Sequence, residues 1–209
     1  MADDEIRELA MFPLGTVLFP HAVLPLHVFE PRYRALVTDC LAGDGSFGVV
    51  LIERGHEVGG GDARFGIGTM TRIVQADEMP DGRWGVVAVG AERIVVHEWL
   101  AEDPYPRAIV TIRPDLAPPR AATPAVDAAR AALVRVHALR AELGLPAYTG
   151  DVLLPDDVGR ASYEAAILAP IGPLDAYALL VVDDPVERLE RLVDLLSGEI
   201  ELLEFRRSG

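Results

Sequence analysis

The stretch Met11–Val37, MFPLGTVLFPHAVLPLHVFEPRYRALV, is mostly apolar but is broken by four prolines, Pro13, Pro20, Pro25 and Pro31. These breaks leave apolar runs too short to cross a membrane, because a transmembrane helix needs about 20 consecutive apolar residues. The runs Leu14–Phe19 and Val23–Val28 have the length of strands and are bounded by glycine or proline, so both are predicted strands. Pro31 favours the start of a helix, since its missing N–H would have no helical partner in the first turn.

This helix is predicted to run from Pro31 to Gly43. An apolar stripe with helical spacing is expected to dock on the strands and to leave Arg34 in water; its members are Tyr33, Leu36, Val37, Cys40 and Leu41. Arg32 lies at the edge of the stripe, where we expect it to pair with a carboxylate, either Glu30 or one from the C-terminal half. Gly43 opens GDGSFG, which matches a dinucleotide-binding pattern in letters. That pattern must follow a strand and open a helix, so here a helix stop and turn is predicted.

Further short strands are predicted along the first half of the chain: Phe47–Ile52, Gly66–Ala76, Trp84–Val89, Arg93–Trp99 and Ala108–Arg113. The turn Pro80-Asp81-Gly82 between two of them predicts a hairpin. Strands this closely spaced indicate a small barrel or a curled sheet.

The second half of the chain reads as helices. They are predicted over Pro124–Leu143, Val158–Leu168 and Leu174–Val182, and from the capping pair Asp184-Pro185 onward. A proline- and alanine-rich stretch precedes them. The fold class is therefore predicted as α+β, with a β subdomain over 1–116, a linker over 117–123 and a helical subdomain over 124–209.

Composition excludes several chemistries. All 19 basic residues of the 209 are arginine and there is no lysine. Schiff-base catalysis, Ser–Lys dyads and the phosphate-binding lysine of a P-loop are therefore ruled out for this chain. The formal net charge of −14 disfavours binding to nucleic acid or to anionic membranes.

Few residues are available for a metal or a disulfide. Cys40 is the single cysteine, and the five histidines show no ligand spacing, so we expect neither a metal nor another cofactor. The N-terminal MADDEIRELA has no apolar core of a secretory signal, and no membrane-spanning run follows. A cytoplasmic protein is the expectation.

The opening stretch resembles the start of the substrate-binding domain of Lon proteases. The matching residues are Leu14, Val17, Phe19, Pro20, Pro25, Leu26, Phe29, Glu30, Pro31, Arg32, Tyr33 and Leu36. Leu179–Leu203 resembles a later segment of the same domain, with Val181 departing from the usual acidic residue. The matches there are Asp184, Arg188, Leu189, Leu192, Leu196 and Glu199.

The resemblance implies a PUA-like β-barrel followed by a helical bundle, and a role in recognising polypeptides. The chain carries no Walker motif and no Ser–Lys dyad. We therefore expect a stand-alone bacterial substrate-binding-domain protein that is not an enzyme.

Three functions from different classes stay open. The first is a module that binds unfolded polypeptide or a protein partner, through residues that are otherwise simply core: Phe19, Phe29, Glu30, Arg32, Tyr33 and Trp84. The second is RNA binding, suggested by the PUA-like fold alone, with Arg64, Arg72, Arg83 and Arg93 as candidates. The third is an enzyme of unrecognised type. The sequence does not specify the oligomeric state.

Overall fold

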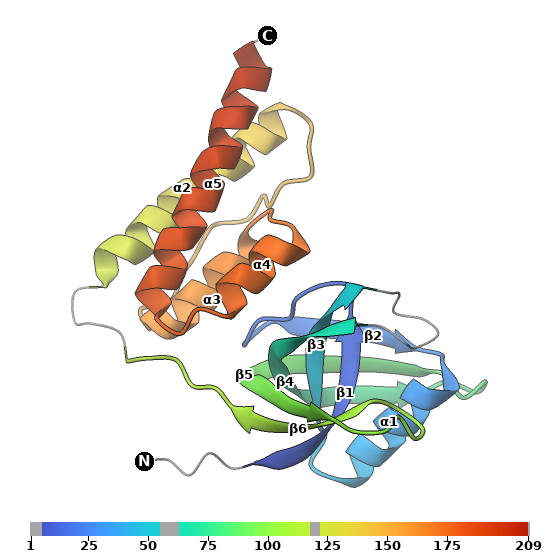
Figure 1. Ribbon diagram of the computed structural model, residues 1–209. Coiled ribbons are helices and arrows are strands. Elements are labelled where there is room, and N and C mark those ends of the chain that lie inside the picture. The colour runs from blue at the N-terminus through green and yellow to red at the C-terminus, as the bar shows by residue number, and fades with distance from the viewer. Residues whose placement is uncertain (1–5, 55–62, 118–121, 209) are drawn as a thin grey trace. The chain divides into compact units, whose positions relative to one another are not determined.

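The computed structural model describes residues 6–54, 63–117 and 122–208. Within these residues the chain forms six strands and five helices (Figure 1). The chain divides into two compact units, Met1–Pro114 and Asp115–Gly209. The first unit holds the strands and one helix and the second holds four helices, so the α+β class is confirmed.

The strands of the first unit form one curled, mixed sheet. They are β1 (Arg7–Leu14), β2 (Val23–Val28), β3 (Ser46–Arg54), β4 (Ala63–Glu78), β5 (Trp84–Trp99) and β6 (Arg107–Ile112). Their order is β2-β5-β4-β3-β1-β6, and only the β1–β3 pair is parallel. The beginning of β5 pairs with β2 and its end pairs with β6, so this one strand contacts both ends of the order. The sheet must curl strongly, because β5 can pair with both end strands only if the sheet bends round on itself. The natural twist of the strands favours this curl.

Two strand predictions are wrong. Leu14–Phe19 is not a strand: β1 ends at Leu14, while Leu18 and Phe19 are buried by side-chain packing outside any ladder. The two strands predicted over 84–89 and 93–99 form the single strand β5. A register shift against β4, where Thr71 pairs with Gly90 and Met70 with Glu92, absorbs the break that the sequence indicated.

The turn between β4 and β5 has the predicted hairpin geometry. Glu78 pairs with Trp84 across it, and the Gly82 N–H donates to the Met79 carbonyl. Gly82 has φ of +76°, a conformation that side-chain-bearing residues rarely adopt.

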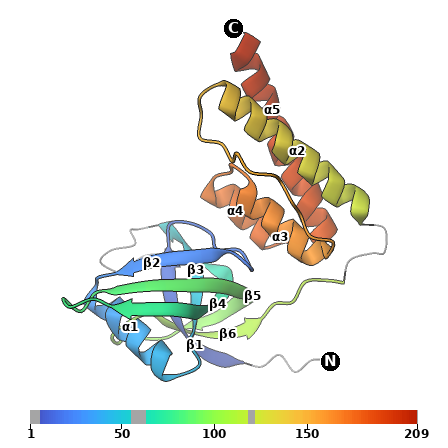
Figure 2. The ribbon, with the colours of Figure 1, turned by 180° about the vertical axis from the view of Figure 1, so that it is seen from behind.

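Helix α1 (Pro31–Ala42) lies against the sheet (Figure 2). Most of the predicted stripe faces the core. Tyr33, Leu36, Val37 and Cys40 are buried, whereas Leu41 is 42% exposed and does not belong to the stripe. The expectation that Arg34 lies in water is also wrong, because Arg34 is half-buried and its guanidinium covers Gly82. The helix ends at Gly43 and β3 begins at Ser46, so GDGSFG is a helix stop and turn.

The second unit consists of α2 (Thr123–Glu142), α3 (Val158–Leu168), α4 (Pro173–Leu180) and α5 (Pro185–Ser208). Their apolar stripes meet in a core with Leu133, Leu192 and Leu196 fully buried. The side chains of Asp157 and Asp184 accept backbone N–H groups at the starts of α3 and α5, as capping predicts. Residues 118–121 of the predicted linker lie outside the described part of the chain.

Candidate functional site

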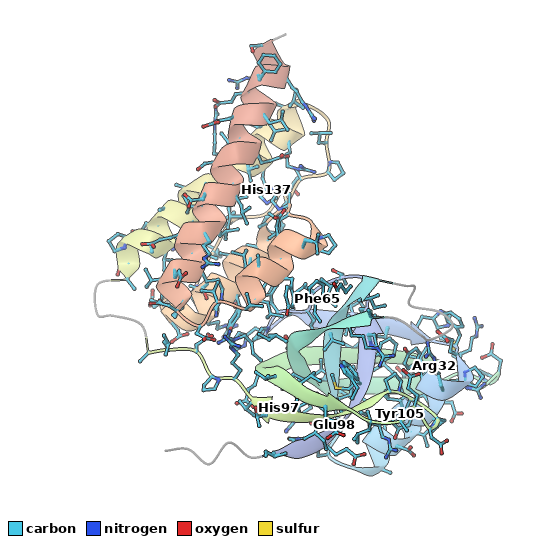
Figure 3. The ribbon with its side chains drawn as sticks, viewed as in Figure 1. Arg32, Phe65, His97, Glu98, Tyr105 and His137 are labelled. Atoms are coloured by element: carbon cyan, nitrogen blue, oxygen red, sulfur yellow. The ribbon has the colours of Figure 1, made fainter. Side chains whose placement is uncertain are left out.

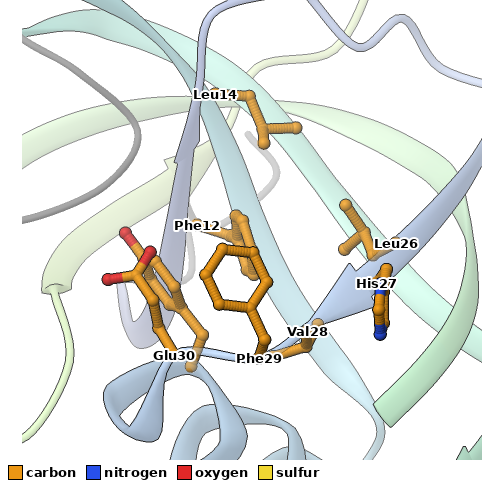
Figure 4. Close-up of a pocket in the computed structure, with 8 residues that line it drawn as sticks. Phe12, Leu14, Leu26, His27, Val28, Phe29 and Glu30 are labelled. Atoms are coloured by element: carbon orange, nitrogen blue, oxygen red, sulfur yellow. The ribbon is translucent and has the colours of Figure 1, made fainter. Parts of the chain in front are cut away.

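An apolar pocket lies in the first unit where β2 leads into α1 (Figure 4). Its volume is about 110 Å³. It is lined by Phe12, Leu14, Leu26, His27, Val28, Phe29, Glu30 and Tyr33. β1 supplies the first two of these and the end of β2 the next three, whereas Phe29 and Glu30 come from the turn into α1 and Tyr33 from α1 itself. The pocket therefore collects apolar side chains from β1, β2 and α1 around residues Phe29–Tyr33, the FEPRY turn.

Two stacked aromatic rings fix one wall of the pocket. The Phe12 and Tyr33 ring centroids are 4.2 Å apart, with 20° between the planes, and both residues are buried. Phe29 is different: its side chain is 54% exposed. Figure 4 shows the Phe29 ring beside Phe12, with Leu14 at the end of the pocket away from Glu30. The pocket thus combines a fixed aromatic wall with a large ring that water reaches.

Arg32 connects the turn to a neighbouring loop by ion pairs. Its Nε lies 3.2 Å from Glu30 Oε2 and its Nη1 lies 3.6 Å from Glu102 Oε2. The guanidinium also lies 4.4 Å from the Tyr33 ring centroid. The expected pair with Glu30 is confirmed, and the second carboxylate belongs to the β5–β6 connection. Glu102 in turn pairs with Arg64, so the charges form a continuous network beside the pocket.

Two buried ionisable groups are the Cys40 thiol of α1 and the Tyr105 hydroxyl of the β5–β6 connection. Burial is the main cause that raises the pKa of the Cys40 thiol to about 12, and the charges of Asp39 and Asp44 contribute. Burial likewise raises the pKa of Tyr105 to about 12, followed by its hydrogen bond to Asp39. The Tyr105 hydroxyl donates to Asp39 Oδ2 at 2.8 Å and ties the β5–β6 connection to α1. Tyr105 is labelled in Figure 3. Both groups keep their protons at neutral pH, so neither is an activated nucleophile.

The structure brings together some of the predicted site residues and separates others. Phe29, Glu30 and Tyr33 line the pocket, and Arg32 lies beside it. Phe19 is buried, with 4% exposure, and does not line the pocket. Trp84 begins β5, where it is half-buried against the core of the sheet.

The site predicted from the sequence did not include the pocket residues that come from the strands. Leu26, His27 and Val28 were predicted as strand residues, and Leu26 was also among the residues that match the family, but none of the three was predicted to line a site. Phe12 and Leu14 of β1 reach the pocket through tertiary packing, for which the sequence carries no local signal.

The arginines considered for RNA binding do not share one environment. Arg93 is buried, with 2% exposure, and the Arg64 guanidinium lies over Trp99. Arg83 pairs with Asp81 in the β4–β5 turn, and Arg72 is exposed on β4.

No group of three His, Cys, Asp or Glu side chains in residues 6–54, 63–117 and 122–208 is arranged to hold a metal ion. His137 of α2 uses both ring nitrogens inside the second unit: Nε2 lies 2.9 Å from the Leu168 carbonyl, and Nδ1 accepts the Tyr148 N–H. His56 lies outside the described residues. No described helix is both long and apolar enough for a membrane span.

Comparisons with known proteins agree over most of the chain. The chain is 32% identical over 205 residues to Lon protease 2 of Herpetosiphon aurantiacus, covering 95% of this chain and 24% of that protein. It is 28% identical to the Lon protease of Koribacter versatilis, covering 97% of this chain and 25% of that protein. The chain thus spans about a quarter of the length of these curated relatives.

Solved structures give the same result. A Lon N-terminal domain protein from Xanthomonas campestris matches with a TM-score of 0.66 and 29% identity, covering 90% of this chain and 98% of that one. The N-terminal domain of a Mycobacterium avium complex Lon protease shares the fold, with a TM-score of 0.66 and 18% identity over 91% of this chain and 98% of that one. The family model of the ATP-dependent protease La (LON) substrate-binding domain matches residues 8–198. The chain therefore belongs to the LON substrate-binding domain family.

Proposed function

We propose that this chain is a non-catalytic module that binds polypeptide segments of protein substrates or of a protein partner, and that it holds them at the pocket beside Phe29. Membership of a substrate-binding domain family supports the polypeptide ligand. The curated relatives are Lon proteases, and the part of them that this chain resembles is about a quarter of their length. We assign neither peptide cleavage nor ATP hydrolysis to this chain.

We locate polypeptide binding at this pocket because the Phe29 side chain is exposed. A ring that is 54% exposed on the wall of an apolar pocket leaves hydrophobic surface in water, and such surface beside a hollow is typical of a binding site. Pockets for drug-sized molecules measure about 300–1,000 Å³, whereas this one measures about 110 Å³. The pocket therefore suits one large apolar side chain of a polypeptide.

The strand next to the pocket favours side-chain insertion over strand addition. Within the described residues, β2 pairs with β5 alone and so is an edge of the sheet. Pro25 lies in the middle of β2 and has no N–H to offer to an added strand. A bound segment would gain little from backbone pairing there, so apolar contact with Phe29, Phe12 and Leu26 supplies the binding energy.

We infer in addition that the curled sheet is of the PUA-like kind, and that nucleic acid is not its ligand. Support for the first comes from the six-stranded sheet with α1 between β2 and β3. Support for the second comes from the net charge of −14 and from Arg64 and Arg83 being paired to carboxylates. Phosphate contacts need free cations.

A titration with an unfolded protein tests the polypeptide site. The probe is fluorescently labelled α-lactalbumin that has been reduced and carboxymethylated, and its anisotropy is followed as the full chain is added. Phe29→Ser should weaken binding at least fivefold. The matched control is Leu41→Ser, since Leu41 is 42% exposed on α1 and does not line the pocket, and its affinity should stay within twofold. Equal affinities for both variants would reject the pocket as the site.

A further inference from the structure

Helix α5 carries a glycine that the fold itself does not require. Gly198 lies well inside this helix, which runs from Pro185 to Ser208. A Cβ built at Gly198 meets no atom of the described chain within 4 Å. Glycine in a helix interior lowers stability relative to alanine. Neither backbone conformation nor internal packing therefore accounts for the missing side chain.

Gly198 lies on the floor of a groove along α5. One hollow of about 380 Å³ is lined by Gly198, Leu195 and Leu202 of α5 and by Ile171 and Asp175 on the opposite side. A second hollow of about 360 Å³ adjoins it, shares Leu195 and includes Ala178 of α4. The residues that α5 contributes, from 191 to 202, recur at intervals of three and four, so they form one face of the helix. The small residues Gly198 and Ala178 leave room for another backbone to approach.

The rim of this groove is acidic. Asp175 and Asp194 line it, and neither forms an ion pair with a described residue. The other charged groups there are already paired: Glu199 with Arg140 at 2.9 Å, and Arg191 with Glu187 at 2.6 Å. An apolar floor between free carboxylates is complementary to an apolar segment flanked by cations. The net charge of −14 makes a second copy of this chain a poor occupant, because like charges repel.

The geometry also selects the conformation of the occupant. The groove is formed by α4, α5 and the α3–α4 connection at residues 170–172, and no strand is among its lining residues. An extended segment would therefore find no strand ladder to join there. A helix brings its own backbone hydrogen bonds and presents only side chains. The α5 face from 191 to 202 is about 16 Å long at 1.5 Å per residue, which matches about three turns of a second helix packed beside it.

We propose that the groove formed by α4 and α5 binds an amphipathic α-helix of another protein. The helix presents an apolar stripe at i, i+3, i+4 and i+7 to Leu195, Leu202 and Gly198. Lysine or arginine residues flank its stripe and pair with Asp175 and Asp194. This surface belongs to the helical unit, so it is a second binding surface besides the polypeptide pocket of the first unit.

Two designed peptides test the ligand chemistry. Both are helical 14-residue peptides of leucine, alanine and flanking charges, and they differ only in carrying lysine or glutamate beside the leucine stripe. Calorimetric titration into the full chain should give saturable one-to-one binding of the lysine peptide. The glutamate peptide should bind at least tenfold more weakly. Replacing both Asp175 and Asp194 by asparagine should reduce this preference. Absence of saturable binding, or equal binding of both peptides, overturns the proposal.

Variants of α5 test the location. Gly198→Leu should weaken binding of the lysine peptide at least tenfold. Ser197→Leu is the matched control, because Ser197 is exposed on α5 outside the groove and its hydroxyl donates to the Val193 carbonyl of the same helix. This change should alter the affinity less than twofold. Gly198→Ala should raise the melting temperature of the protein but lower its affinity for the lysine peptide, which separates an effect on binding from an effect on folding. Equal affinities of Gly198→Leu and Ser197→Leu would refute the site. So would a dimer in sedimentation that Gly198→Leu dissociates, since the occupant would then be a second copy.

Discussion

Arg188 and Asp115 form an ion pair inside the second unit, with Arg188 Nη2 2.7 Å from Asp115 Oδ1. The Arg188 side chain is completely buried, whereas that of Asp115 is 21% exposed. The guanidinium also donates to Ser162 Oγ and the Val182 carbonyl, and lies 4.0 Å from the Tyr163 ring centroid. The Tyr163 hydroxyl donates to Asp115 Oδ1 at 2.8 Å. The start of the second unit is thus held to its last helix by a shared set of polar contacts.

The unequal exposure of this pair predicts unequal costs of breaking it. Asp115→Ala leaves a buried, uncompensated guanidinium, and breaking a buried pair in this way costs about 3–5 kcal/mol. Arg188→Met leaves Asp115, which reaches water, and removes the buried charge, so its cost should be smaller. Urea denaturation followed by the helical circular dichroism signal measures both. Glu187→Ala, which breaks an exposed pair with Arg191, should cost at most about 1 kcal/mol. A cost of Asp115→Ala no greater than that of Glu187→Ala would contradict this view.

The packing of α1 predicts a contrast between Leu36 and Arg34. Leu36 is fully buried, and truncating such a residue to alanine costs about 2–5 kcal/mol. Arg34 lies over the β4–β5 turn and takes no part in the apolar core of the sheet, so Arg34→Ala should cost about 0.5 kcal/mol. Thermal and urea unfolding of the two variants give the comparison. If Arg34→Ala were as costly as Leu36→Ala, the contact with Gly82 would be a major support of the turn.

Stability should fall above pH 9 because of Cys40 and Tyr105. Their folded-state pKa values are raised to about 12, from 9.0 and 10.0 respectively. At pH 7.5, well below both unfolded-state pKa values, both groups are almost fully protonated in the folded and the unfolded chain, so they add little pH dependence there. As pH rises further, the unfolded chain releases these protons first and unfolding becomes easier, by at most about 1.4 kcal/mol per pH unit for each group. Urea unfolding from pH 7.5 to 10.5 measures the decline. Cys40→Ala should flatten it between pH 9 and 10, and parallel curves for the two proteins would rule out a role of the thiol.

Elements with local signals were predicted well. The bounds of α3 match the predicted Val158–Leu168, since the helix periodicity lies within the segment and the capping residue Asp157 immediately precedes it. The apolar run Leu14–Phe19 misled, because Leu18 and Phe19 are buried by the core without a strand ladder. Burial and strand pairing give the same pattern of apolar letters, and only tertiary structure separates them.

Contacts between distant residues had no such signal. The Phe12–Tyr33 stack joins β1 to α1, and the partner Glu102 of Arg32 lies in the β5–β6 connection. The Arg188–Asp115 pair spans 73 residues. A charged residue at the edge of an apolar stripe predicts that it needs a partner, as for Arg32 and Glu30, but a local pattern does not say which distant element provides a second one.

Arg32 is the residue whose substitution should separate binding from folding. Its guanidinium bridges Glu30 and Glu102 and lies over Tyr33, so it holds the turn that carries Phe29. Its side chain is 16% exposed, whereas Leu36 is fully buried in the apolar core, so Arg32→Ala removes less apolar burial than Leu36→Ala. Arg32→Ala should therefore lower the melting temperature less than Leu36→Ala does. It should nevertheless weaken binding of the unfolded α-lactalbumin probe about as much as Phe29→Ser does.

Arg32→Lys provides the matched control for this prediction. A lysine keeps the charge but not the planar fork that contacts both carboxylates and the ring, so it should recover stability more fully than probe affinity. Melting temperature and anisotropy titration are measured on the same preparations. If Arg32→Ala and Leu36→Ala lose equal melting temperature while the folded fraction of Arg32→Ala binds normally, the FEPRY turn is purely structural. Under that outcome, Arg32 stabilises the turn without contributing to recognition.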